Sequence, residues 1–166
     1  MSEKDEVFSG KVKHSGIFDF KELYRFCYVW LVDKEYQVIE KEYTEKLGPT
    51  GKEVVIKWDA KRKISDYFRY VIKTEWRILN MKDAEVEMDG AKVTLNKGNT
   101  EIKAKAILEK DFESRWENSG FLKFLRGMYD KYLIRGRISD YEDKMLEEVD
   151  EYLAETKAFL ALEGKH

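Results

Sequence analysis

FRYVIKTEWRI, residues 68–78, is the stretch that decides the fold. One set of alternate positions is apolar or aromatic, with Thr74 as its single polar member. The positions between them carry mostly charged side chains: Arg69, Lys73, Glu75 and Arg77. Because successive side chains of a β-strand point to opposite faces, this alternation predicts a half-buried strand of an antiparallel sheet.

Similar alternation surrounds this stretch. Strands are predicted over 54–60 and 101–109, with weaker signals at 7–14 and 36–46 and a turn at 47–51. Asp89-Gly90 predicts a hairpin between two further short strands, 84–88 and 91–95, because both residue types tolerate a positive φ. Lys97-Gly98-Asn99 predicts another turn. The result is a twisted antiparallel sheet of about six strands.

Three helices are predicted around this sheet. Asp19 and Glu22 have the spacing of a helix cap, which favours a helix over about 19–33; a buried strand at 26–32 is the alternative. A second helix is predicted over 119–134, with Ser119 as a cap and Gly136 ending it. A long last helix is predicted from the capping box of Ser139 and Glu142 to about Leu162.

The fold class is therefore α+β, in one domain spanning residues 1–166, with the last helix gripped by the sheet. This order of elements resembles the START-like helix-grip superfamily, from which the extra helix at 119–134 departs. The resemblance is one of topology alone and carries over no residue. It implies that the chain binds a lipid or another apolar molecule between sheet and helix, although some members are enzymes or protein-binding modules.

The inward face of the sheet combines large rings with small side chains, which is the mixture that encloses a ligand or interdigitates into a solid core. The predicted ligand-binding residues are Trp58, Phe68, Tyr70, Trp76, Ala104, Ala106 and Tyr152. With a solid core, the chain is instead expected to be a protein-interaction module. No cofactor is expected.

Charge is distributed unevenly near the C-terminus. Residues 115–138 carry a net charge of +4, from six basic and two acidic side chains, and residues from 139 onward carry −6. The helix at 119–134 is also apolar around much of its circumference. We therefore expect packing inside the protein, a subunit contact, or peripheral contact with an anionic membrane. The predicted contact residues are Lys123, Arg126, Lys131 and Arg135.

Other functions find less support. The outward sheet face carries basic residues that suit nucleic acid, but Asp59, Glu75, Glu101 and Glu109 share that face. The basic set is Lys57, Lys61, Lys63, Arg69, Lys73, Arg77, Lys103 and Lys105. His14 is predicted to be a surface residue and Cys27 a buried apolar one, and no spacing indicates a metal site or catalysis. The lone cysteine and the charged start predict a cytoplasmic protein.

Overall fold

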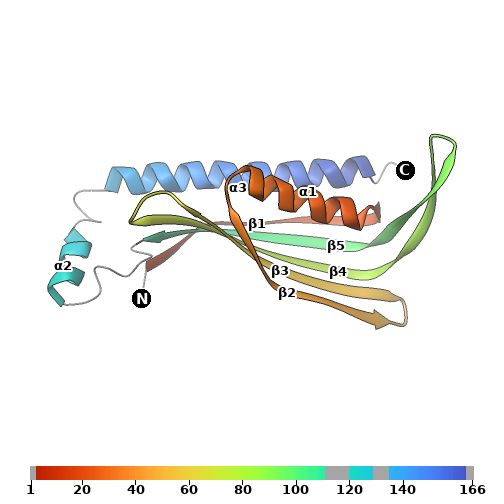
Figure 1. Cartoon of the computed structure of the whole chain (residues 1–166), viewed down its shortest axis with the longest axis horizontal. Coiled ribbons are helices and arrows are strands. Elements are labelled where there is room, and N and C mark those ends of the chain that lie inside the picture. The colour runs from red at the N-terminus through yellow and green to blue at the C-terminus, as the bar shows by residue number, and fades with distance from the viewer. Residues whose placement is uncertain (1–2, 111–119, 129–134, 164–166) are drawn as a thin grey trace.

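The structure, a computed structural model, describes residues 3–110, 120–128 and 135–163 (Figure 1). The strands are β1 (Glu3–Phe18), β2 (Gln37–Gly48), β3 (Gly51–Lys63), β4 (Phe68–Met88) and β5 (Ala91–Lys110). The helices are α1 (Phe20–Asp33), α2 (Gly120–Met128) and α3 (Arg135–Glu163). The strands form one antiparallel sheet in the order β1-β5-β4-β3-β2, so the predicted α+β class is confirmed.

The sheet has five strands in the described part of the chain, not about six, because β4 and β5 are longer than predicted. Residues 84–88 continue β4, and Lys97-Gly98-Asn99 lies inside β5, so the predicted turn there is wrong. The pairing of β4 with β5 continues through this region, with a register shift between Leu79 and Lys82. Gly98 permits this: a Cβ there would lie 3.0 Å from the carbonyl oxygen of Leu79. The Asp89-Gly90 hairpin is confirmed, with φ of 52° and 79°.

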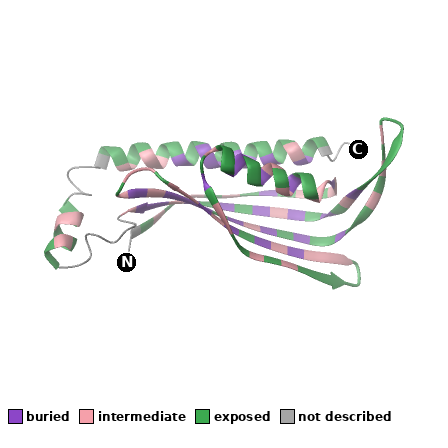
Figure 2. Cartoon of the chain, viewed as in Figure 1, coloured by how far each residue is buried: buried purple, intermediate pink, exposed green. Residues whose placement is uncertain are grey.

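The predicted parity of the sheet is confirmed. Inward residues of β4 such as Ile72 and Trp76 are buried, whereas Lys73 and Arg77 on the other face are exposed. Purple and green therefore alternate along the strands in Figure 2. Trp58, Ile72, Trp76 and Ile102 join Val149 and Tyr152 of α3 in one hydrophobic cluster.

The first predicted helix is confirmed, so the alternative of a buried strand at 26–32 is wrong. Asp19 is the N-cap of α1, and its Oδ1 accepts a hydrogen bond from the backbone N–H of Glu22 at 3.2 Å. One stripe of the helix is buried, including Leu23, Cys27 and Leu31. Trp30 is also buried, and in a strand it would lie on the face opposite these three side chains, whereas the helical period brings all four onto the core.

The long last helix begins earlier than predicted. Gly136 and Ser139 lie inside α3, so neither the stop at Gly136 nor the capping box at Ser139 exists. Ile138 packs against the core, and this contact favours a helix that starts before Ser139. A glycine inside a helix costs only about 1 kcal/mol, which such packing offsets. The other predicted helix is α2 over its described residues, while Ser119 and 129–134 lie outside the described part.

The gripping arrangement also differs from the prediction, because two helices share the inward face (Figure 1). α3 packs on β1 and β5, and α1 covers the tryptophans of β3 and β4. Gly10 of β1 allows the close approach of α3, since a Cβ there would lie 2.8 Å from Cδ1 of Leu153. Small residues on β1 and β5 thus let α3 pack closely on that half of the inward face. The half formed by β3 and β4 is left to α1.

Candidate functional site between the sheet and the two helices

The predicted ligand-binding residues all meet in one cluster between the sheet and the helices. None of their side chains is more than 3% exposed, and all seven belong to the hydrophobic core: Trp58, Phe68, Tyr70, Trp76, Ala104, Ala106 and Tyr152. The rings touch one another. The centroids of Trp58 and Trp76 lie 5.4 Å apart, and Tyr152 lies 4.8 Å from Trp30 of α1. The predicted site is therefore a layer of packed aromatic side chains.

α1 covers the tryptophan end of this layer. The ring of Tyr24 lies edge-on to Trp58, with centroids 5.0 Å apart, and 6.2 Å from Trp76. Glu40 of β2 accepts hydrogen bonds from the hydroxyl of Tyr24, at 2.5 Å, and from Nε1 of Trp58, at 2.9 Å. Burial, reinforced by the bond to Glu40, raises the pKa of Tyr24 to about 12. Tyr24 and Glu40 were not among the predicted site residues.

Four buried polar atoms in this layer have no hydrogen-bond partner among the described residues: Thr74 Oγ1, Trp76 Nε1, Thr100 Oγ1 and Tyr152 Oη. Thr74 and Trp76 are successive inward residues of β4, and Thr100 pairs with Ile78, the next inward residue. Leaving a buried donor or acceptor without a partner costs about 1–3 kcal/mol. Three of these groups thus mark one polar stretch of the inward face.

Tyr152 lies with Cys27 and Thr156 where α1 meets α3. The Sγ atom of Cys27 is 3.8 Å from Oγ1 of Thr156, which donates a hydrogen bond to the carbonyl of Tyr152 at 2.8 Å. Burial raises the pKa of the Cys27 thiol to about 11, and burial also raises the pKa of Tyr152. With this raised pKa, Cys27 is a neutral thiol at neutral pH, buried as the sequence predicted. The nucleophilic form of cysteine is the thiolate, so this environment does not activate Cys27.

An ion pair closes the other end of the layer. Arg62 of β3 bonds to both carboxylate oxygens of Glu148 on α3, at 2.9 and 3.0 Å. Its guanidinium also donates to the carbonyl of Lys34 at 2.6 Å and lies over the rings of Tyr36 and Tyr70. Neither Arg62 nor Glu148 was among the predicted site residues. The period of the strand could have indicated that Arg62 points inward, because it falls on the same face of β3 as Trp58 and Ala60.

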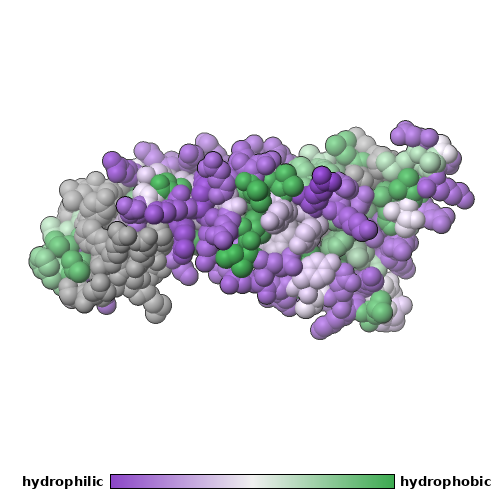
Figure 3. Space-filling view, in the orientation of Figure 1, coloured by the Kyte–Doolittle hydropathy of each residue, from purple (hydrophilic) through white to green (hydrophobic). Residues whose placement is uncertain are grey.

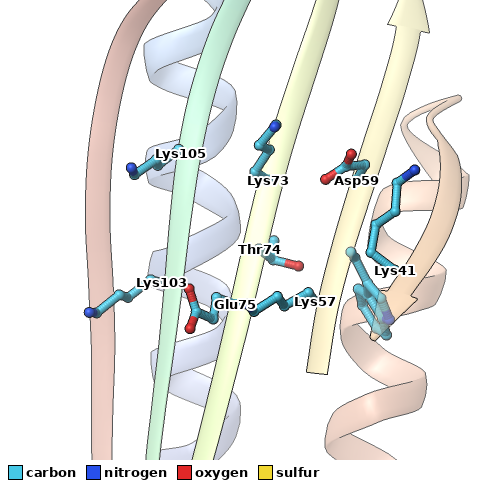
Figure 4. Close-up of a pocket in the computed structure, with 9 residues that line it drawn as sticks. Lys41, Lys57, Asp59, Lys73, Thr74, Glu75, Lys103 and Lys105 are labelled. Atoms are coloured by element: carbon cyan, nitrogen blue, oxygen red, sulfur yellow. The ribbon is translucent and has the colours of Figure 1, made fainter. Parts of the chain in front are cut away.

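The outward face of the sheet carries a shallow pocket of about 350 Å³, shown in Figure 4. Five lysines line it: Lys41, Lys57, Lys73, Lys103 and Lys105. Lys73 faces Lys105 on one neighbouring strand and Asp59 on the other. Lys57 and Lys103 form ion pairs with Glu42 and Glu101, both at 3.4 Å. Carboxylates therefore interrupt the predicted basic face, across strands in the pair of Lys57 and Glu42 and along β5 in the pair of Lys103 and Glu101.

The predicted contact residues fall on different elements. Lys123 and Arg126 belong to α2, Lys131 lies outside the described residues, and Arg135 is the first residue of α3. None of the α2 side chains is buried: Phe121 is 68% exposed, Phe124 61% and Met128 43%. Leu122 and Leu125 are half-buried, so packing of this helix inside its own chain, one of the three expectations, stays a prediction.

The remaining features concern His14, metal binding and membrane-spanning helices. His14 is partly buried. Its Nε2 lies 2.8 Å from the carbonyl oxygen of Ile17, three residues away, so the contact stays within the same strand. Across residues 3–110, 120–128 and 135–163, no three His, Cys, Asp or Glu side chains gather as a metal-binding group. Among the described residues, no helix has the length and apolar character needed to cross a membrane.

Comparisons of the chain with protein-family models, curated proteins and solved structures find no match.

Proposed function

We propose that the protein binds a small hydrophobic molecule that carries a polar group, in the layer between β4, β5 and the two helices. The supporting observation is the polar stretch of Thr74, Trp76 and Thr100, which is buried among aromatic rings without partners. A ligand oxygen beside these groups would supply the missing hydrogen bonds, and the rings of Trp58 and Trp76 would contact its apolar part.

Binding in this layer requires a movement, because the side chains already touch. α1 is the element best suited to move. Its tyrosines Tyr24 and Tyr28 contact Trp58 of β3, whereas α3 is held by Leu153 against Gly10 and by the pair of Arg62 and Glu148. The order of elements, strand, helix, meander and helix, also supports the proposed resemblance to the START-like superfamily. A cytoplasmic location stays a prediction from the sequence.

Native mass spectrometry of protein purified without detergent tests this proposal first. We expect a co-purified apolar molecule, or a complex with palmitate or hexadecanol when either is added. Thr74→Val should then weaken binding of the added probe about tenfold, the loss expected for one hydrogen bond. Thr94→Val, on the exposed part of β5, is the matched control and should change nothing. Wild-type protein that binds neither probe and carries no apolar molecule would contradict the proposal.

A protein-interaction module is the second candidate, and a different observation favours it: α2 has no buried side chain. In this case the core is solid, and the close contact between Leu153 and Gly10 agrees with that. Nucleic-acid binding on the lysine-rich outward face is a third candidate. It predicts affinity that falls steeply with salt and is lost in a Lys73→Glu, Lys105→Glu variant.

A further inference from the structure

An apolar groove of about 300 Å³ lies between α1 and α3, away from the sheet. Phe26 of α1 and Phe159 of α3 stack in it, with ring centroids 4.9 Å apart and planes inclined by 14°. Val29, which is 42% exposed, and Trp30 continue this surface along α1. Figure 3 shows apolar residues at the end of α1 near β2, in the middle of the molecule, bordered by hydrophilic ones. The groove is thus an uncovered apolar strip on the helical side.

The rim of this groove is acidic. Glu22 and Asp33 line it together with one basic residue, Arg25. Glu155 of α3 stands beside them, where it accepts a hydrogen bond from Nε1 of Trp30. The ammonium of Lys34 also lies 5.4 Å from the centroid of the Trp30 ring, so three carboxylates against two cations leave this surface with a net charge of −1. A partner segment that suits it is therefore apolar along one side and basic at its edges.

α2 of the same sequence has these properties. Phe121, Phe124 and Met128 form an exposed apolar stripe, spaced three and four residues apart on the helix. Lys123 stands beside the stripe, and none of residues 120–128 is acidic. In its length and its alternation of apolar and basic side chains, α2 complements the groove that α1 and α3 leave open.

The two surfaces cannot meet fully within one chain. Met128 is separated from Arg135 by seven residue steps, which reach at most about 25 Å when fully extended. Phe159 lies 24 residues further along α3, or about 36 Å at the helical rise. Figure 1 accordingly shows α2 beyond the N-terminal end of α3, while Phe159 is near its other end. Met128 thus cannot lie at the stacked Phe26 and Phe159 of its own chain.

We infer that α2 of one copy docks into the groove between α1 and α3 of a second copy, so that the chain forms a homodimer. In a two-fold dimer each copy gives one helix and accepts one, which covers both apolar surfaces at once. Phe124 contacts Val29 and the stacked pair, and Lys123 lies at the acidic rim. This inference does not depend on the proposed ligand, because the groove is separate from the sheet-facing layer.

Crosslinking of mixed variants tests the contact directly. In full-length protein with Cys27→Ala, Val29→Cys is made in one preparation and Phe124→Cys in another, and the two are mixed with a short bismaleimide. We expect a crosslinked heterodimer from the mixture and little product from either variant alone. Lys105→Cys, on the opposite sheet face, is the control for Val29→Cys and should give no product with Phe124→Cys.

Light scattering with gel filtration provides the second measurement. Wild-type protein should be a dimer in the micromolar range, and Phe124→Asp should raise the dissociation constant about tenfold or more. Circular dichroism confirms that the variant is folded. A wild-type monomer would overturn the inference, as would crosslinking of Phe124→Cys to itself in preference to Val29→Cys. Binding of wild-type monomers to acidic vesicles, abolished by Phe124→Asp, would identify a membrane as the partner and would also overturn it.

Discussion

Thr74 is the only polar side chain on the inward side of the stretch 68–78, and its hydroxyl has no partner among the described residues. It lies between Trp58 on β3 and Ala104 on β5, in the middle of the core. A buried hydroxyl without a partner lowers stability compared with a methyl group of the same shape. Such a residue is more easily explained by binding than by folding, and this is why Thr74 is central to the proposed site.

Replacing Thr74 by valine therefore separates the two roles. We expect Thr74→Val to raise the free energy of unfolding of the ligand-free protein by about 1 kcal/mol, because the unsatisfied hydroxyl is removed at nearly constant volume. Urea denaturation measures this change. Thr94→Val at an exposed position is the control and should shift stability by less than about 0.5 kcal/mol. Loss of stability in Thr74→Val would mean that the hydroxyl has a partner inside the protein.

Cys27 gives a prediction for pH. Burial raises the pKa of its thiol from 9.0 to about 11, so the unfolded chain loses this proton first as pH rises. The stabilising contribution is complete below pH 9 and is lost between pH 9 and 11. Melting temperatures of wild type should thus fall more steeply than those of Cys27→Ala over this window. Similar slopes for both proteins would show that the thiol ionises normally in the folded state.

The helices depend on local signals to different degrees. α1 begins at the cap that the sequence predicts, whereas α3 ignores a capping box and extends past Gly136. The difference lies in what each helix end contacts. Asp19 accepts a hydrogen bond from the N–H of Glu22, whereas Ile138 packs against the core when α3 starts early. Tertiary contact therefore overrides a cap whose contribution is only about 1 kcal/mol.

The cap of α1 can be tested by substitution. Asp19→Ala removes the acceptor for the N–H of Glu22 and should lower the free energy of unfolding by about 1 kcal/mol. Asp19→Asn retains a side-chain oxygen at the same place, so it should stay near the wild-type value. Thermal and urea denaturation both report this difference. Equal effects of the two substitutions would mean that the negative charge near the helix N-terminus matters, and the cap bond does not.

At the scale of the whole molecule, two polar contacts join separate elements at the two ends of the aromatic layer. Glu40 joins Tyr24 of α1 to Trp58 of β3, and the pair of Arg62 and Glu148 joins β3 to α3. Both carboxylates are far in sequence from at least one of their partners. The layer between them is filled by apolar side chains, so these polar contacts fix how the helices are placed over the sheet.

Glu148→Gln should lower the free energy of unfolding by about 2–3 kcal/mol, because the largely buried guanidinium of Arg62 loses its charged acceptor. Glu147→Gln, one position earlier and exposed on α3, is the matched control and should have a small effect. Chemical denaturation of both variants gives the comparison. If Glu148→Gln is as mild as its control, the pair contributes little and packing alone holds α3 on the sheet.

The alternation along 54–60, 68–78 and 101–109 was sufficient to predict the antiparallel sheet and its buried inward face, although Val71 and Glu109 on the outward face are buried as well. The reason is that strand periodicity is a local property, and a shift by one residue would turn every apolar side chain outward. The same holds for Asp89-Gly90 and for Asp19, where the residue type decides the local backbone. The six predicted ligand-binding residues of the sheet consequently lie on its buried face, and Tyr152 of α3 is buried in the same core.

Contacts between distant segments could not be predicted in this way. Local alternation does not show whether a strand ends at Lys97-Gly98-Asn99, because that depends on Leu79 and Met81 lying against Gly98. It does not show that α1 covers the tryptophans while α3 takes β1, since Gly10 must first meet Leu153. Three further features also depend on contacts between distant segments. They are the buried hydroxyls without a partner, the pair of Arg62 and Glu148, and the groove beside Phe159. Each depends on side chains whose distance apart is set by packing, and packing is a property of the folded chain.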